Sequence, residues 1–138
     1  MTRRELREHT FRLLFLKEFY NDEELQEQVQ LYLEDFEDIP DDRKGELRAR
    51  AERIYLCVPQ MDEQINQVAK GWKTHRMGKV DLTIIRLALY EMLYDDEVPE
   101  KVAINEAVEL AKKFGGDDSP SFVNGILGRL VRTAKERA

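Results

Sequence analysis

Apolar side chains recur along most of the chain at intervals of three and four residues, which is the spacing of an amphipathic helix. The clearest stripe consists of Leu25, Val29, Tyr32, Leu33 and Phe36. The same spacing is found in further segments, which cover about 2–20, 47–58, 61–72, 80–93, 100–114 and 120–131. No segment alternates convincingly with the two-residue period of a strand. The sequence therefore predicts an all-α fold with about seven helices.

Short polar residues predict where several of these helices begin. Thr2 is followed by Glu5 at the spacing of a capping box, in which each side chain bonds to the other residue's backbone amide. Asp22, Asp81 and Ser119 are expected to be the N-caps of the second, fifth and seventh helices, because their side-chain oxygens can accept from unpaired amides.

Two interruptions in the middle of the chain predict its division. Pro59 lacks an amide donor and should kink or break the pattern between the third and fourth helices. The segment WKTHRMGK, residues 72–79, is expected to join two helical halves. We therefore expect a single domain, with an N-terminal half of about 1–72 and a C-terminal half of about 73–138.

The break between the last two helices brings two aromatic residues near each other. Gly115 and Gly116 suit a left-handed C-cap, and the short corner that follows should place Phe114 close to Phe122. Burial statistics favour a core position for both rings. Two more glycines interrupt the last helix, where close approach of another helix backbone would explain them: Gly125 and Gly128.

Length and cysteine content fit a cytoplasmic protein. A chain of 138 residues can form one domain with a substantial core. The single cysteine, Cys57, lies in an apolar stretch and is expected to be buried and reduced. No long apolar run predicts a membrane span, and the charged N-terminus has no signal-peptide core.

The net charge of −6 is unevenly distributed. Residues 21–64 contain fourteen acidic and five basic residues, whereas residues 1–20 contain five basic and three acidic ones. Residues 65–138 are nearly balanced, with twelve basic and eleven acidic residues. A surface for nucleic acid would therefore have to be built locally from the two ends of the chain.

Candidate catalytic residues are scarce. His9 and His75 are the only histidines, and neither has metal-ligand spacing to another residue, so surface or capping roles are favoured. The glycine pair at 115 is not followed by the Lys-Ser/Thr of a phosphate loop. We therefore expect no enzyme activity, no catalytic residue, no metal and no cofactor.

Three segments carry a resemblance to a known family. PEKVAINEAVELAKKFGGDDSPSFVNGILGRL, together with RRELREHTFRLLF and WKTHRMGKVDLTIIRLALYEML, resembles the NusB family of transcription antitermination proteins. The resemblance implies two small, three-helix-like bundles packed together. It also implies binding to the boxA element of ribosomal RNA leader transcripts together with NusE, a ribosomal protein, and action on elongating RNA polymerase without catalysis.

The resemblance implies RNA contacts at the start of the chain. Arg3, Arg4 and Arg7 match the family's basic N-terminal motif. Arg3 and Arg7 are four residues apart and share a helix face. Their guanidinium groups suit phosphate oxygens and stacking on unpaired bases. A solvated helix end remains the alternative for this trio.

The central helix offers a second candidate RNA contact. Arg86 and Tyr90 are also four residues apart and lie off the main apolar stripe of their helix. An arginine beside an aromatic ring can bind single-stranded RNA. The alternative is a structural ion pair between Arg86 and Glu106 or Glu109.

The corner between the last two helices matches the family's partner-facing patch. The residues assigned to this patch are Phe114, Asp118, Ser121 and Phe122. Many family members carry lysine at the position of Ser121, and Phe122 is also a candidate RNA contact. Exposed aromatic residues of this kind are typical of interaction surfaces.

Two other functions remain open at this point. A helical protein–protein adaptor would use the aromatic corner and would make the N-terminal arginines incidental. An autoinhibited homodimer that covers the RNA face is a further alternative, in which the chain does not bind RNA directly.

Overall fold

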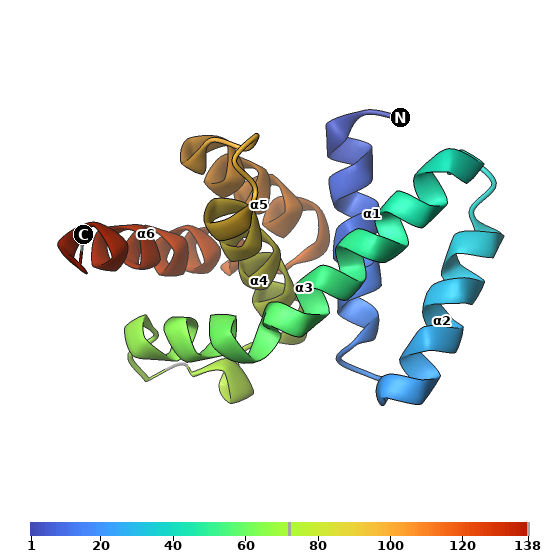
Figure 1. The fold of residues 1–138 in the computed structure, drawn as a ribbon. Helices are drawn as coiled ribbons and strands as arrows, with labels where there is room; N and C mark the ends of the chain where they lie inside the picture. The colour runs from blue at the N-terminus through green and yellow to red at the C-terminus, as the bar shows by residue number, and fades with distance from the viewer. Residues whose placement is uncertain (72, 138) are drawn as a thin grey trace. The chain divides into compact units, whose positions relative to one another are not determined.

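The computed structural model describes residues 1–71 and 73–137, and over that range the chain is helical, without strands (Figure 1). The elements are α1 (Arg3–Leu16), α2 (Asp22–Asp35), α3 (Asp41–Val68), the 3-10 turn η1 (Thr74–Arg76), α4 (Lys79–Tyr94), α5 (Glu100–Phe114) and α6 (Ser119–Arg137). The predicted all-α class is confirmed. The number of helices is close to the seven expected.

The third and fourth predicted helices are one continuous helix, so the break expected at Pro59 does not occur. Apolar side chains stay in phase on both sides of the proline; those that are buried are Leu47, Ala51, Ile54, Val58, Met61, Ile65 and Val68. Pro59 itself lies on the exposed side of α3. Burial of one uninterrupted stripe therefore keeps the helix together, while the missing amide falls on the side that faces water.

The chain packs as two compact units, Met1–Leu56 and Cys57–Ala138, which divide within α3. The halves expected from the sequence met at the segment 72–79 instead. The difference arises because the last turns of α3 belong to the second unit, where the Val68 carbonyl accepts from Arg129 of α6. Trp72, which was expected to end the fourth apolar stripe, lies outside the described residues.

The first unit packs α1, α2 and the beginning of α3 around one apolar cluster. Its buried members are Leu13, Leu25, Val29, Leu33, Ile39, Leu47 and Ala51. Across this unit the hydroxyl of Tyr55 donates to the carbonyl of Leu13 at 2.5 Å. This bond joins α3 to α1, although the two residues are far apart in the sequence.

The second unit is built around α4, whose buried side chains occupy more than one face. Helices α5 and α6 pack against it and against each other. Small residues on α5, Ala103, Ala107 and Ala111, are buried at the contact and allow the helices to approach closely. Val123, Ile126, Leu127 and Leu130 form the buried stripe of α6.

The predicted helix starts are partly confirmed. The amide of Glu5 donates to Thr2 Oγ1 at 3.1 Å, as a capping box requires. Asn21 rather than Asp22 caps α2, because its Oδ1 accepts from the Glu24 amide at 2.9 Å. Asp22 then lies in the first turn, where negative charge is also favourable.

Two further sequence-based expectations need correction. Helix α4 begins at Lys79 with Gly78 as its N-cap, so Asp81 lies within the first turn. Cys57 is only partly buried rather than fully enclosed. Among the described helices, none is both long enough and apolar enough to cross a lipid bilayer.

Candidate functional site

Three arginines stand at the start of α1. Arg3 and Arg4 are exposed, and Arg7 is partly buried one turn later. The Thr2 cap fixes the beginning of the helix beneath them. Positive charge at a helix N-terminus opposes the helix dipole, typically by about 0.3–1 kcal/mol per exposed charge. The helix dipole therefore does not favour these arginines, whereas a polyanionic ligand would be attracted to them.

His9 lies on the same helix and is buried, which corrects the expectation of a surface or capping role. Its Nδ1 is 2.6 Å from the Tyr32 hydroxyl, and its ring meets the edge of Phe36 at a centroid distance of 5.1 Å. Burial lowers the pKa of His9, partly offset by the negative charge of Asp38. The neutral imidazole thus anchors α1 to α2, two turns after the first arginines.

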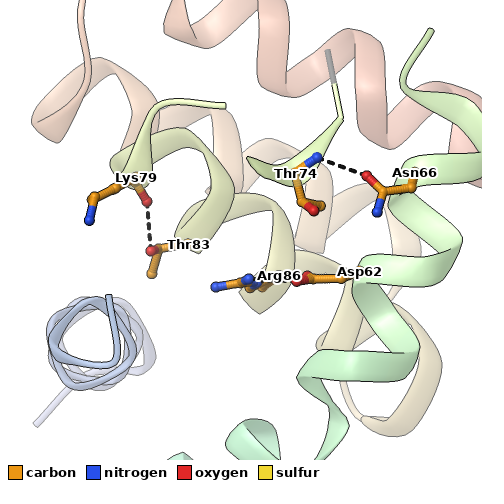
Figure 2. Close-up of polar contacts among 6 residues, drawn as sticks. All are labelled: Asp62, Asn66, Thr74, Lys79, Thr83 and Arg86. Carbon is orange, nitrogen blue, oxygen red and sulfur yellow. Dashed lines mark hydrogen bonds and ion pairs between the residues drawn. The ribbon is translucent and has the colours of Figure 1, made fainter. Parts of the chain in front are cut away.

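Arg86 of α4 forms a two-bond ion pair with Asp62 of α3 (Figure 2). Nε donates to Oδ1 at 2.8 Å and Nη2 donates to Oδ2 at 2.6 Å. The side chains are only 11% and 22% exposed, so water screens the pair weakly. The sequence had suggested Glu106 or Glu109 as structural partners. It gave no signal for Asp62, which belongs to another helix.

Tyr90 lies one turn after Arg86 and is buried, with 7% of its surface exposed. Its ring is tilted against that of Tyr94, at a centroid distance of 5.3 Å. Tyr94 is 49% exposed. The aromatic surface that α4 presents to solvent near this point therefore belongs to Tyr94, which the sequence interpretation did not select although it continues the four-residue spacing.

The corner between α5 and α6 is tighter than the left-handed cap that was expected. Gly115 has a φ of −96°, outside the left-handed region. A side-chain carbon at Gly115 would lie 2.5 Å from Ser119 Cβ and Oγ, so the close approach of the two helices requires glycine. The Gly116 amide donates to Ser119 Oγ at 3.0 Å and holds the start of α6 in place.

The four residues assigned to the partner-facing patch all lie at this corner. Phe114 ends α5, Asp118 is in the turn before α6, and Ser121 and Phe122 are in the first turn of α6. Phe114 and Phe122 are partly buried, whereas Asp118 and Ser121 are exposed. The Lys113 ammonium lies 5.5 Å from the centre of the Phe114 ring. The two rings are thus neither enclosed in the core nor fully exposed, and each retains surface that a partner could cover.

The two glycines inside α6 were expected to allow close approach of another helix, and the described part of the structure does not place a helix there. A side-chain carbon at Gly125 would meet nothing within 4 Å, and one at Gly128 would meet only the Arg132 guanidinium, at 3.6 Å. No second helix backbone therefore approaches them among the described residues.

The second histidine of the chain lies far along the sequence from His9. His75 is exposed on η1. Within residues 1–71 and 73–137, no three histidine, cysteine, aspartate or glutamate side chains are grouped so that they could hold a metal ion.

Comparison with known proteins gives a consistent result. The family model described as "NusB family" matches residues 4–132. Transcription antitermination protein NusB of Lachnoclostridium phytofermentans is 53% identical over 131 residues, which cover 95% of this chain and 99% of that protein. The protein of the same name from Agathobacter rectalis is 45% identical over 131 residues, which cover 95% of this chain and 100% of that protein.

Solved structures agree. NusB of T. maritima has a TM-score of 0.83 and 32% identity, with 100% of this chain and 99% of that chain covered. A chain in the crystal structure of a plectonemic RNA supercoil has the same fold, with a TM-score of 0.81 and 21% identity, over 99% of this chain and 98% of that chain. The family match spans nearly the whole chain, and the two curated relatives are similar over almost their full lengths. This chain belongs to the NusB family of transcription antitermination proteins.

Proposed function

We propose that this protein is a cytoplasmic, non-catalytic factor for antitermination and ribosomal RNA synthesis. In this proposal it binds boxA-like single-stranded RNA together with the ribosomal protein NusE and joins the elongating RNA polymerase. Membership of the NusB family supports the class of function. The observation that carries the RNA assignment is the trio Arg3, Arg4 and Arg7 at the start of α1, where the helix dipole disfavours positive charge.

In this mechanism the N-terminal arginines bind RNA phosphates and stack on unpaired bases. The cap at Thr2 and the partly buried contact between His9 and Tyr32 keep the first turns of α1 ordered before RNA arrives. RNA then loses less affinity to the ordering of the protein than it would on a flexible arm.

Arg86, Tyr90 and Phe122 complete the proposed RNA contacts. Because Asp62 already occupies two donors of Arg86, a phosphate would have to share this guanidinium or displace the carboxylate. Tyr90 is buried and would act through Arg86 and Tyr94 rather than by stacking on a base itself. The N-terminal arginines should therefore contribute more to RNA affinity than the pair on α4.

NusE is proposed to dock at the corner between α5 and α6. Phe114 and Phe122 would supply the aromatic contact area, and Asp118 and Ser121 the polar contacts beside them. The rigid corner at Gly115 keeps the two rings on adjoining helices. A ribosomal protein with basic character would also compensate for the net charge of −6 when RNA binds.

A protein–protein adaptor, or a homodimer that blocks RNA, is the second candidate. The ion pair between Arg86 and Asp62 and the burial of Tyr90 favour it, because both give the α4 residues structural roles. In that case the corner would still bind a partner, and RNA would not be needed.

The decisive experiment is a titration of boxA RNA with the protein, alone and with NusE, at two salt concentrations. Replacing Arg3, Arg4 and Arg7 with alanine should weaken RNA binding by at least about tenfold and reduce its salt dependence by about 2 in log–log slope. The matched control replaces three arginines of α3, Arg43, Arg50 and Arg53, with alanine. Equal RNA affinity for both variants in the presence of NusE would refute the RNA assignment and favour the adaptor.

A further inference from the structure

Two segments without acidic residues meet in the second unit. Residues 64–80 contain four basic residues and no acidic ones, and residues 123–135 contain three basic residues and no acidic ones. The net charge of both segments is positive, although the chain as a whole has a net charge of −6. None of their basic residues belongs to the proposed RNA site or to the corner between α5 and α6.

The fold joins these segments at the C-terminal end of α3. Arg129 Nη1 of α6 donates to the Val68 carbonyl at 3.4 Å, which places this part of α6 beside the last turn of α3. The chain then turns at Gly71, whose φ is +81°, and returns toward α3. There the Thr74 amide donates to Asn66 Oδ1 at 2.8 Å (Figure 2).

The side chains of this basic surface are exposed. We define it by the cations of the two segments, which the bond from Arg129 to Val68 joins. They are Lys70, Lys73 and Arg76 from the α3–α4 connection, Lys79 from the start of α4, and Arg129, Arg132 and Lys135 from α6. Two of them have a structural use, because Lys73 Nζ and Arg129 Nη1 donate to the carbonyls of Asn66 and Val68 at the end of α3. One or two cations are enough to satisfy a helix C-terminus, so capping of α3 gives no reason for seven cations in these two segments.

We propose that this basic surface binds the phosphate backbone of single-stranded RNA, as a second contact separate from the arginines of α1. A protein partner would need apolar anchors. Among the described residues, the large apolar side chains that are exposed lie elsewhere: Met1, Phe19, Leu31, Leu56, Leu93, Tyr94 and Val102. In the described part of this surface, which leaves out residue 72, the lysines and arginines lie without such anchors. Such a surface suits a polyanion, whose binding is driven by release of counterions and needs no particular sequence.

The proposal takes from the proposed function only the class of ligand, and it can be tested without boxA. The probe is fluorescent oligouridylate of about 30 nucleotides, which is longer than the site of about 4–16 nucleotides that one OB-fold covers on a single strand. The test variant is Lys70→Gln/Arg76→Gln/Arg132→Gln, which leaves Lys73 and Arg129 to cap α3. Its thermal unfolding should match that of the unmodified protein.

The control variant is Lys44→Gln/Arg53→Gln/Lys101→Gln, which changes the net charge equally at cations that lie near acidic residues in the sequence. The test variant should bind the oligonucleotide about tenfold more weakly at low salt, with a salt slope smaller by about 2, since each contact with a single strand contributes about 0.7. The control should change far less.

Equal losses in the test and control variants would overturn the proposal, because only the overall charge would then matter. Unchanged RNA binding combined with weaker binding of polyglutamate would also overturn it and would indicate an acidic protein partner. The result is independent of the proposed boxA site: loss of oligouridylate binding in the test variant supports the second contact even if the Arg3, Arg4 and Arg7 variant binds boxA normally.

Discussion

The arginines at the start of α1 and the arginine in the middle of α4 carry the same charge in different surroundings. Arg3 and Arg4 are exposed at a helix end whose dipole disfavours them. Arg86 is 11% exposed and bonded through two nitrogens to Asp62. The helix dipole does not favour the first two, whereas Arg86 joins α4 to α3 through its ion pair with Asp62. Sequence resemblance treats all of them as RNA contacts, and only the surroundings separate them.

The largest loss of stability is expected when the ion pair between Arg86 and Asp62 is removed. Asp62→Ala should destabilise the protein by about 2–3 kcal/mol, because it leaves a mostly buried guanidinium without this carboxylate. Chemical denaturation of the single variants and of Asp62→Ala/Arg86→Met would measure the coupling. We expect the double variant to recover about half of the loss, since a buried pair can be replaced by an apolar side chain at little cost.

A matched control for this pair is Lys44→Ala, which removes a more exposed ion pair to Asp41 at 3.4 Å and should change stability by less than about 0.5 kcal/mol. If Asp62→Ala is no more damaging than the control, Arg86 has no structural task, and the distinction between the two regions fails.

A smaller effect is expected at His9, which anchors α1. Because burial lowers the pKa of His9 from 6.5, the unfolded chain takes up a proton at a higher pH than the folded protein does. This residue therefore contributes stability that is fully present above about pH 6.5 and decreases as the pH falls toward the lowered pKa of the folded state. Denaturation from pH 7.5 to pH 5 should show this loss.

The His9 effect can be separated from the titration of carboxylates. His9→Phe should show a weaker dependence of stability on pH than the unmodified protein, and His75→Gln, which alters an exposed histidine, should not. An identical pH dependence in all three proteins would mean that the buried imidazole does not resist protonation, and that α1 is anchored by apolar contacts alone.

The smallest effect on stability should come from the α1 arginines. Arg3→Gln/Arg4→Gln should leave the free energy of unfolding unchanged or raise it by about 0.3–1 kcal/mol, because it removes cations from a helix N-terminus. Thermal unfolding at low salt is the measurement, since salt screens the dipole effect. A loss of more than about 1 kcal/mol would show that these arginines make stabilising contacts, and their exposure would then no longer argue for a ligand.

The hydrophobic pattern of the sequence predicted where the helices lie better than it predicted where each helix begins and ends. The stripe from Leu47 to Val68 keeps one phase through Pro59, so the continuous helix could have been predicted if the phase had been weighed above the proline. For the glycines at the corner between α5 and α6, the sequence pattern did not predict the correct structural role. The sequence suggested left-handed backbone, but Gly115 is needed because Ser119 lies 2.5 Å from where a side-chain carbon would be. Proximity between residues of different helices leaves no periodic signal.

The sequence by itself determined the helical class, the apolar stripes that become the two cores, and the segments that resemble the NusB family, because each depends on residues close together along the chain. Only the tertiary structure decided the pairing of Arg86 with Asp62, the contact of His9 with Tyr32, and the contact of Arg129 with Val68 at the end of α3. Helical spacing specifies which side chains share a face. It does not specify which face of another helix they meet, since that depends on how all the buried surfaces pack at once.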